Sequence, residues 1–414
     1  MEDIQNRTGM KRQSGGTFIK GILTGGLGVF LVMLLIFLPL MKSKQTGQSP
    51  EFVTTGDSEW LNRDAQTKLN TLEKLIEENY YEDVDRDELV TGMYKGLFEG
   101  LGDPYSTYYT PEEYEDMMIS TNANYYGIGA GLQQDTRSMV VTVTFVYEGS
   151  PAEAAGIKPG DEIVKVGEIE GTSMELSELV THIRGEEGTS VHLEIMREEE
   201  GALEFDVERA KVDIPTVEYQ MLEGSVGLVQ VSEFAENTPE KFEAAINDLT
   251  EQGMTKMIVD LRNNGGGLVL ACQQMLDIIL PEGVVVYTED KNGDRFDYTS
   301  DAERSMDIPI VVLVNENTAS ASEIFAGAIR DFEYGTIVGT TTFGKGIVQT
   351  IQKLPDGSAV KITTAKYYTP NGDNIHGTGI TPDVEAEYKY LGDEEGDYDP
   401  MMDSQVLKAL EVLR

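Results

Sequence analysis

Two segments in the second half of the chain share one plan, in which an apolar strand runs into a polar or glycine-rich loop and then a helix. The first reads "KMIVDLRNNGGG" and then "LVLACQQMLDIIL", and the second reads "IPIVVLVNENTASASEIFAGAIRDF". A continuous apolar run such as residues 308–314 is typical of a strand covered on both faces. The sequence therefore predicts an α/β domain over residues 212–390, with loops at the strand ends available for a functional site.

The rest of the 414-residue chain divides into segments of different pattern. Residues 60–118 have apolar positions at helical spacing and predict a small helical module, suited to packing or to contact in a homodimer. Residues 125–209 predict a β-rich unit of short strands, glycine turns and one amphipathic helix. Residues 391–414 form a C-terminal tail and helix. The predicted fold class is a multidomain α+β protein.

Near the N-terminus, residues 21–41 form an uncharged run of 21 residues. A helix of that length, at about 1.5 Å per residue, matches the roughly 30 Å hydrocarbon core of a membrane. Because "PLMKSKQTG" lacks the small-x-small site of a signal peptide, the sequence favours an uncleaved single-pass anchor. The excess of Lys and Arg in residues 1–20 predicts a cytoplasmic N-terminus. Residues 42–59 are then a linker to an extracytoplasmic catalytic part.

Composition excludes some partners and sites. Asp and Glu number 73 against 32 Lys and Arg, for a formal net charge of −41, so the chain lacks the cationic field that binds nucleic acid. The single cysteine, Cys272, excludes an intrachain disulfide and leaves too few thiols for a zinc finger. Its apolar neighbours predict a buried structural thiol.

Three short segments are candidates for chemistry. In "NENTASASE", Ser320 and Ser322 either cap a helix or include a nucleophile, and the three histidines are all distant in sequence. In "DLRNNGGG", the glycines either make a tight turn or present amides to an oxyanion. A phosphate cradle is disfavoured because GxxxxGK[ST] is missing. In "TTFGKGIVQT", Lys345 is either a solvated surface charge or a base.

Taken in chain order, the helical module, the β-rich unit, "DLRNNGGG", "NENTASASE" and "TTFGKGIVQT", with "NGDNIHGTGITPD" and "DSQVLKALEVL" after them, resemble the S41 family of carboxyl-terminal processing peptidases. The resemblance covers nearly the whole chain after the apolar run. It implies an α/β crotonase-like protease core in which Ser320 is the nucleophile, Lys345 the general base and Gln349 the residue that orients the lysine. It also implies an oxyanion hole made of the backbone amides of Gly266 and Ala321.

Within residues 125–209, "YGIGAGLQ" and "GSPAEAAGIKPGDEIVKVGE" together resemble a PDZ domain, although a glycine-rich turn alone also fits a plain hairpin loop. Arg184, after the predicted groove helix, either couples peptide docking to assembly of the active site, as a gate, or forms a surface salt bridge. The resemblance implies that a peptide C-terminus binds beside the strand near Ile128. The backbone amides that would hold its carboxylate are those of Gly127, Ile128, Gly129, Ala130 and Gly131.

A Ser–Lys pair can work without histidine. A lysine amine of ordinary pKa, about 10.4, is protonated at neutral pH, and burial among glycines and apolar residues lowers that value. Neutral Lys345 would then accept the proton of Ser320, and an acyl-enzyme would form without a metal or an organic cofactor.

The sequence thus predicts a membrane-anchored serine endopeptidase that cuts extracytoplasmic proteins selected by their C-terminal tails. A PDZ scaffold with a degenerate protease domain is the first alternative, and loss of the serine or the lysine would have marked it. An acyl-transferring enzyme of the crotonase type shares the oxyanion logic, but it does not explain the PDZ unit.

Overall fold

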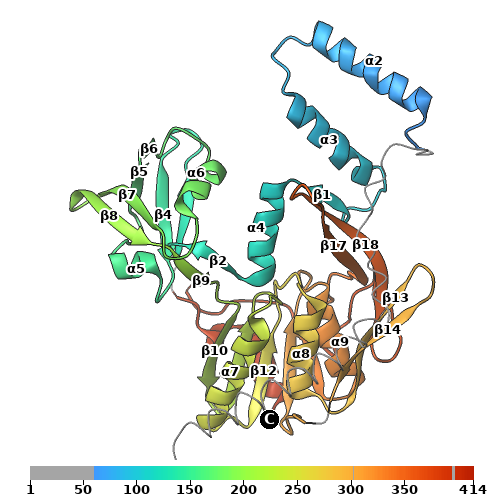
Figure 1. The fold of residues 1–414 in the computed structure, drawn as a ribbon. Helices are drawn as coiled ribbons and strands as arrows, with labels where there is room; N and C mark the ends of the chain where they lie inside the picture. The colour runs from blue at the N-terminus through green and yellow to red at the C-terminus, as the bar shows by residue number, and fades with distance from the viewer. Residues whose placement is uncertain (1–59, 302, 394–396) are drawn as a thin grey trace, which may run out of the picture. The chain divides into compact units, whose positions relative to one another are not determined.

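The computed structural model describes residues 60–301, 303–393 and 397–414, and it divides into two units, residues 1–85 and 86–414 (Figure 1). In the first unit the described residues form the helix α2 (Arg63–Asn79), capped by the Asn62 side chain, which accepts from two first-turn amides. The predicted anchor, residues 21–41, lies outside the described residues. Within the described ranges, no helix combines the length and the apolar character needed to cross a membrane.

The second unit begins with helix α3 (Arg86–Glu99), the three-residue strand β1 (Thr107–Tyr109) and helix α4 (Pro111–Asn122). Helix α4 starts in a capping box, in which the Thr110 hydroxyl accepts from the Glu113 amide and the Glu113 carboxylate accepts from the Thr110 amide. The sequence pattern predicted these helices. It did not predict β1, because a strand of three residues is too short to show an alternation of apolar and polar positions.

The PDZ-like unit is entered by β2 (Asn124–Gly127) and left by β9 (Ala210–Asp213), which pair as an antiparallel ribbon. Its sheet has the order β3-β4-β5-β7-β8, with β6 paired to β5. The predicted amphipathic helix is α6 (Leu176–Ile183), and a short helix that the sequence analysis missed, α5 (Pro151–Ala155), follows β4. The strands are β3 (Ala130–Gln134), β4 (Val141–Val146), β5 (Glu162–Val166), β6 (Ile169–Glu170), β7 (Ser190–Arg197) and β8 (Gly201–Glu208).

The central sheet of the second half confirms the predicted strand–loop–helix plan. Its order is β10-β11-β12-β15-β16-β19, and every neighbouring pair is parallel except β10 with β11. Strand β15 is buried along its whole length, as its apolar sequence predicted. The strands are β10 (Val217–Leu222), β11 (Val226–Val231), β12 (Lys256–Asp260), β15 (Ile310–Val314), β16 (Gly335–Gly339) and β19 (Val384–Glu385).

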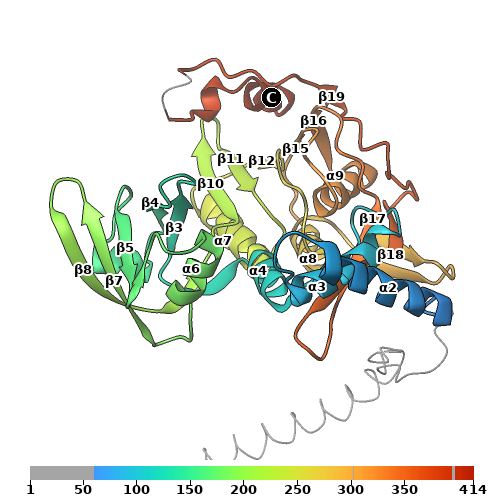
Figure 2. The ribbon, with the colours of Figure 1, turned by 90° about the horizontal axis from the view of Figure 1, so that it is seen from above.

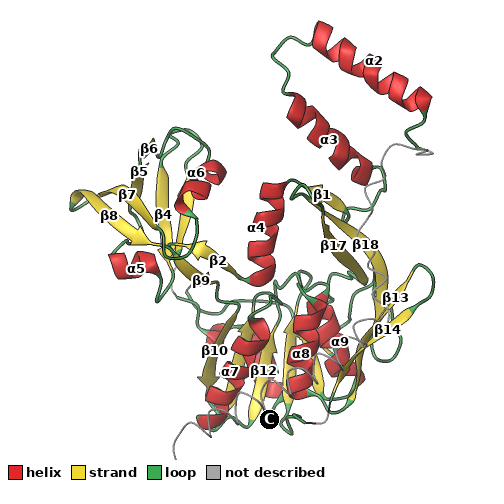
Figure 3. Cartoon of the chain, in the orientation of Figure 1, coloured by secondary structure: helices red, strands yellow, loops and turns green. Residues whose placement is uncertain are grey.

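Helices cover both faces of this sheet, which explains why its strands are apolar throughout. On one face lie α7 (Thr238–Glu251), α8 (Val269–Ile279) and α9 (Ala321–Asp331), packed on alternate strand residues such as Val259 and Val312 (Figure 3). On the other face, α10 (Ser404–Val412), preceded by the 3-10 turn η1 (Pro400–Met402), packs on Ile258 and Val311 (Figure 2). Helices α8 and α9 follow directly on the two candidate loops.

A second sheet, which the sequence analysis did not predict, lies beside the first. Its order is β1-β18-β13-β14, and β17 pairs with β18. Strand β1 thereby joins the segment before the PDZ-like unit to strands more than 200 residues later in the chain. The strands are β13 (Gly283–Asp290), β14 (Arg295–Ser300), β17 (Ile347–Lys353) and β18 (Ala359–Tyr368).

Candidate active site

Ser320 stands in a strained turn between the buried strand β15 and helix α9. Its backbone angles, φ 57° and ψ −116°, are disfavoured for any residue with a side chain, and such conformations gather at functional sites. Two contacts hold it there. Its amide donates to Glu323 Oε2 at 2.9 Å, and its carbonyl accepts from the Tyr367 hydroxyl at 3.1 Å. The turn presents the Ser320 side chain to a cavity instead of to the core.

Ser322 has a different environment. It is fully buried, and its hydroxyl donates to the backbone carbonyl of Asn264 at 3.0 Å. The carbonyl of Asn264 also accepts from the Ala319 amide at 3.0 Å. Ser322 therefore ties the start of α9 to the glycine loop, and of the two serines only Ser320 lines the cavity.

The three side chains predicted to be catalytic, Ser320, Lys345 and Gln349, line one cavity of about 580 Å³. Burial is the largest cause that lowers the pKa of the Lys345 amine, and the positive charge of Lys361 lowers it further. The carboxylates of Asp103 and Glu323 act in the opposite direction, and the net shift is downward. This is the direction that a lysine base requires.

Glu323 connects the backbones of Ser320 and Lys345. Its carboxylate is completely buried and accepts four hydrogen bonds, two on each oxygen. Oε2 accepts from the amides of Ser320 and Lys345, at 2.9 and 2.8 Å. Oε1 accepts from the Gly344 amide at 2.8 Å and from the Thr342 hydroxyl at 2.5 Å. One side chain thus fixes both backbones, a role that the sequence analysis did not foresee for this position.

The glycines that flank Lys345 allow its loop to pack on the segment "NIHGTG". A Cβ on Gly346 would lie 2.6 Å from the backbone nitrogen of His376, and Gly344, at φ 88°, would approach the Gly379 nitrogen to 2.8 Å. The Gly344 carbonyl accepts from the Gly377 amide at 2.8 Å. The pair of glycines is therefore a packing requirement of the loop that carries the lysine.

The three side chains share the cavity without bonding to one another. Gln349 Nε2 donates to the Thr363 hydroxyl at 3.3 Å, and the Lys345 amine lies 4.7 Å from the centre of the Tyr105 ring. Over residues 60–301, 303–393 and 397–414, no hydrogen bond links the Ser320 hydroxyl, the Lys345 amine and the Gln349 amide to each other. The three side chains therefore share one cavity, but in this conformation a proton cannot pass directly from Ser320 to Lys345.

Gly266, the predicted oxyanion residue, lies directly against the start of α9. It has φ 103°, and a Cβ there would lie 2.8 Å from the nitrogen of Ala321, the other predicted oxyanion residue. The Gly266 amide, however, donates to Asn264 Oδ1 at 2.8 Å, and its carbonyl accepts from Phe234 at 2.9 Å. Gly266 and Ala321 therefore lie next to each other, as an oxyanion hole requires, but the Gly266 N–H is bonded to Asn264 Oδ1 in this conformation.

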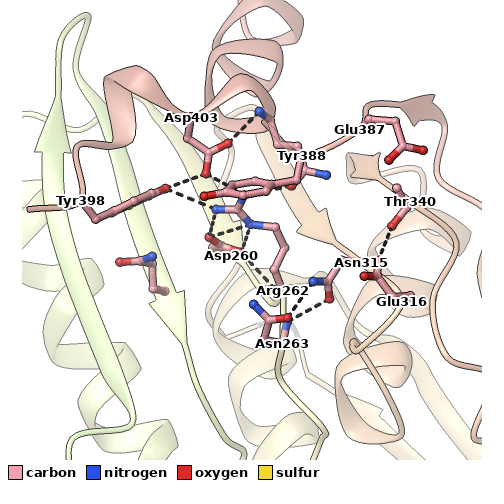
Figure 4. A pocket seen from close by; sticks show the side chains of 12 residues that line it. Asp260, Arg262, Asn263, Asn315, Glu316, Thr340, Glu387, Tyr388, Tyr398 and Asp403 are labelled. Atoms are coloured by element: carbon pink, nitrogen blue, oxygen red, sulfur yellow. Dashed lines mark hydrogen bonds and ion pairs between the residues drawn. The ribbon is translucent and has the colours of Figure 1, made fainter. Parts of the chain in front are cut away.

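Behind the glycine loop, a polar pocket of about 630 Å³ holds a buried ion-pair network that the sequence analysis missed (Figure 4). The Arg262 guanidinium lies 2.6 Å from Asp260 Oδ2 and 2.7 Å from Asp403 Oδ2, and it also donates to Gln405 at 2.9 Å. Because Asp403 and Gln405 begin α10, the network fastens the C-terminal helix to the strand end that leads into the glycine loop. The motif "DSQVLKALEVL" supplies both partners.

Cys272 is buried, as its sequence context predicted. Its Sγ donates to the backbone carbonyl of Ala321 at 3.2 Å, and burial raises the pKa of the thiol well above its ordinary value. The thiol is therefore protonated and packs under the start of α9.

The PDZ-like unit carries a separate groove of about 220 Å³ beside β3 and α6. Of the residues predicted to bind a peptide terminus, Ile128 and Ala130 line this groove. The backbone of Gly129 packs closely against Ser150, because a Cβ on Gly129 would lie 2.3 Å from Ser150 Cβ. Gly127 ends β2, and Gly131 lies in β3. The groove is lined by Tyr125, Ile128, Ala130, Leu132, Leu176, Val180, Ile183 and Arg184.

Arg184 connects this groove to helix α4. Its guanidinium lies 2.7 Å from Asp116 Oδ1, and it also lies over the Tyr125 ring, 5.6 Å from the ring centre. One residue after Asp116, Met117 lines the catalytic cavity, and so do two later residues of α4. A continuous chain of contacts thus runs from the peptide groove to the wall of the candidate active site.

Comparisons with known proteins bear on the family of the chain. The family model described as Peptidase family S41 matches residues 225–386, the PDZ domain model matches residues 116–196, and the model of the Activating protease CtpB N-terminal domain matches residues 22–113. Among solved structures, the photosystem II D1 C-terminal processing protease is 31% identical, with 80% of this chain and 90% of that chain covered and a TM-score of 0.46.

Two curated relatives are similar over most of the chain. The carboxy-terminal processing protease CtpA of Bacillus subtilis (strain 168) is 38% identical over 335 residues, 81% of this chain and 70% of that protein. A probable CtpA-like serine protease of Staphylococcus aureus (strain COL) is 38% identical over 332 residues, 78% of this chain, and the chain spans 66% of that protein, just under two thirds. The chain therefore belongs to peptidase family S41 and is a serine-type carboxyl-terminal processing peptidase with a PDZ domain.

Proposed function

We propose that this protein is a membrane-anchored endopeptidase that cuts extracytoplasmic proteins with a Ser320–Lys345 dyad. The observation that carries the proposal is the shared cavity, which is lined both by a serine held in a strained turn and by a lysine whose pKa is lowered by burial. Residues 21–41 would attach the chain to the membrane with a cytoplasmic N-terminus. Protease added to spheroplasts should then digest an epitope placed after Arg414, and protection of that epitope would reverse the orientation.

In the proposed reaction, neutral Lys345 accepts the hydroxyl proton of Ser320 while Oγ attacks the carbonyl carbon of the scissile peptide bond. The amides of Ala321 and Gly266 donate to the resulting oxyanion. The Lys345 ammonium then returns its proton to the leaving amine, and water hydrolyses the acyl-enzyme by the same base. Two movements are needed, because the amine must reach Ser320 and the Gly266 N–H must leave Asn264 Oδ1.

Three substitutions test the dyad. Ser320→Ala should abolish both turnover and labelling by a fluorophosphonate probe, and Lys345→Arg should abolish turnover because a guanidinium keeps its proton. Gln349→Ala should reduce the rate less than either. Ser322→Ala is the matched control, since it removes a neighbouring buried hydroxyl and should cost about 1 kcal/mol of stability with activity retained. Near-wild-type proteolysis by Lys345→Arg would defeat the mechanism.

We also propose that the PDZ groove selects substrates whose last side chain is aliphatic. Apolar side chains line it, among them Leu132, Leu176 and Val180. The lining residues Ile128 and Ala130 alternate with glycines in the sequence, and the backbone amides of this segment would hold a terminal carboxylate. Peptide substrates that end in Ala, Val or Leu should be cut faster than the same peptides ending in Asp. Amidation of the terminal carboxylate should weaken cleavage, and equal rates on free and amidated tails would remove this part of the proposal.

Arg184 is proposed as the gate between groove and active site. A bound carboxylate near Arg184 would compete with Asp116 for the guanidinium, and release of Asp116 would free α4, which lines the catalytic cavity. Asp116→Asn should then raise the rate on a substrate without a recognised tail, whereas Arg184→Ala should abolish the difference between tailed and tail-less substrates. The exposed pair Lys74–Glu78 offers a control, because Glu78→Gln breaks a surface ion pair on α2. Unchanged kinetics in both variants would leave Arg184 as a plain salt bridge.

Homodimer formation through the helical module is a further part of the proposal. Helix α3 exposes several large apolar side chains, an unfavourable arrangement for a helix that stays in water. Leu97→Glu together with Met93→Glu should convert a dimer to a monomer in sedimentation experiments, and an unchanged mass would place the contact elsewhere. The exposed apolar residues of α3 are Leu89, Val90, Met93, Tyr94 and Leu97.

A further inference from the structure

A short turn between α3 and β1, residues 103–106, reaches the catalytic lysine. The centre of the Tyr105 ring lies 4.7 Å from Lys345 Nζ. Asp103 shapes the turn, because Oδ1 accepts from the Tyr105 amide at 3.0 Å and Oδ2 accepts from the Ser106 hydroxyl at 2.6 Å. Ser106 is only 6% exposed, and its Oγ also accepts from the backbone amide of Thr363 at 2.9 Å. The turn is thus held by three part-buried hydrogen bonds, and its Tyr105 ring contacts the lysine.

The same turn is bonded to the strand pair that carries Gln349. Thr363 in β18 is the register partner of Gln349 in β17, and the pairing of these strands shifts between Val348 and Gln349. At this bulge Gln349 Nε2 donates to the Thr363 hydroxyl at 3.3 Å, while the Thr363 amide is held by Ser106 from the other side. The Ser106 side chain therefore extends the contact of β1 with β18 up to the position opposite the glutamine.

We propose that residues 103–106 are a positioning element for the lysine base, in which the Tyr105 ring sets where the Lys345 amine rests and Ser106 holds the strand opposite Gln349. The inference rests on the proposed role of Lys345. An ammonium is attracted to the face of an aromatic ring, and a neutral amine is not. The ring therefore holds the protonated lysine between turnovers and lets the amine leave for Ser320 once the proton is lost.

The charged groups that face Lys345 come from three elements. Asp103 in the turn and Glu323 in α9 favour the ammonium, and Lys361 in β18 disfavours it. Lys361 also lines the cavity. The turn thus supplies both the ring and one of the two carboxylates that stabilise the charged form. Removing either should make Lys345 easier to deprotonate, even where the amine is then poorly placed for catalysis.

Tyr105→Leu and Tyr105→Phe in the full-length protein separate a positioning role from simple packing. The Lys345 amine is followed directly by NMR of protein labelled with [ε-¹³C]lysine, its signal assigned by its loss in Lys345→Arg. Tyr105→Phe keeps the ring and should leave kcat within about twofold and the pH profile unchanged. Tyr105→Leu should lower the pKa of Lys345 by about half to one unit, lower kcat about tenfold and change KM less than about threefold.

Ser106→Ala provides a second test that does not depend on the ring. It should lower kcat severalfold, because it loosens the strand opposite Gln349, and it should change the pKa of Lys345 less than Tyr105→Leu does, because the ring and both carboxylates are kept. The control is Tyr287→Leu, which removes a ring that lies 3.6 Å from the Arg295 guanidinium in the same sheet. Its kcat and the pKa of Lys345 should both match the wild type.

The proposal is overturned if Tyr105→Leu leaves the pKa of Lys345 unchanged, whether or not kcat falls, since a loss of packing alone would reduce activity without changing that pKa. It is overturned equally if Tyr105→Phe behaves like Tyr105→Leu. Failure of the proposed function has a separate signature, because Lys345→Arg would then remain active while the NMR signal of Lys345 still responds to the ring.

Discussion

The buried carboxylate of Glu323 holds the backbones of both Ser320 and Lys345, and replacing it by an amide tests whether the candidate site depends on it. Glu323→Gln keeps the size and shape of the side chain. It converts one of two acceptor oxygens into an N–H₂ group, which cannot accept a hydrogen bond. In the native protein Oε1 accepts from Gly344 and Thr342, and Oε2 accepts from Ser320 and Lys345.

The size of the effect follows from which donors lose their acceptor. If the new amino group faces Thr342, that hydroxyl can turn and accept, and one buried amide, that of Gly344, is left without a partner. If it faces the other way, both the Ser320 and Lys345 amides are left. One unsatisfied buried amide costs about 1–3 kcal/mol, and loss of the charge weakens the bonds that remain. We expect the free energy of unfolding to fall by about 2–4 kcal/mol.

Activity should fall more steeply than stability. Ser320 and Lys345 are held by the same oxygen, so release of either backbone changes the distance between nucleophile and base. A displacement on the order of 1 Å is enough to cost about a hundredfold in rate. At about 2–4 °C per kcal/mol, the melting temperature of the protease domain should fall by about 4–16 °C.

The assay compares Glu323→Gln with Glu251→Gln, which removes an exposed carboxylate at the end of α7. Melting is followed by calorimetry, and kcat is measured at a temperature where both variants are folded, checked by circular dichroism. Glu251→Gln should match the wild type in both. If Glu323→Gln melts and turns over like the control, then the four bonds to the carboxylate do not hold the site together.

Further predictions concern Lys345, the glycine loop, Cys272 and the C-terminal clamp, which is the ion-pair network of Arg262 with Asp260 and Asp403. Because the lowered pKa of Lys345 belongs to a base that must lose its proton, kcat/KM should rise about tenfold per pH unit and level off below the ordinary value of 10.5; a rate that falls with pH over this range would exclude a lysine base. Gly266→Ala should abolish turnover while the chain stays folded, since its φ is 103° and a Cβ would lie 2.7 Å from a backbone oxygen; active Gly266→Ala enzyme would contradict this geometry. Asp403→Ala leaves Arg262 with one of two carboxylates and should lower the free energy of unfolding by about 3 kcal/mol in urea titrations, and a smaller effect than at an exposed ion pair would refute the clamp. Cys272 should resist thiol reagents until the protein unfolds, and rapid labelling of the native protein would show that the start of α9 opens.

The sequence was sufficient where the chemistry of a segment decides its structure locally. The apolar run of β15 and the capped helix after it follow from neighbouring residues, and so does the burial of Cys272. The second sheet was not predicted, because most residues of β17 and β18 are exposed or half-buried, and because β18 pairs with β1, a strand more than 200 residues earlier. The anchor and the membrane topology stay predictions, since residues 21–41 lie outside the described part of the chain. The homodimer through the helical module stays a prediction as well.

Within the site, sequence motifs identified side chains that face the cavity and missed those that hold them. Ser320 and Lys345 stand out because a reactive residue type sits in an unusual loop. Glu323 acts through residues up to 22 positions away, and Ser106 through Thr363, 257 positions away, so nothing in the local pattern of either reveals its partner. The partners of Glu323 and Ser106 could not be recognised in the sequence because they lie far away along the chain.

The proposed role of Lys345 as a base requires that its amine be neutral, although the chain around it is strongly acidic. A formal net charge of −41 favours every ammonium on the protein, yet the pKa of Lys345 is lowered. Burial overcomes the field because it acts on one group at short range, whereas distant charges are screened within about 10 Å at ordinary salt. The Glu323 carboxylate accepts its four hydrogen bonds from three backbone amides and a hydroxyl. It therefore binds Lys345 through the backbone amide of that residue and not through the side-chain amine. The buried acid can therefore assemble the site without forming the ion pair that would keep the base protonated.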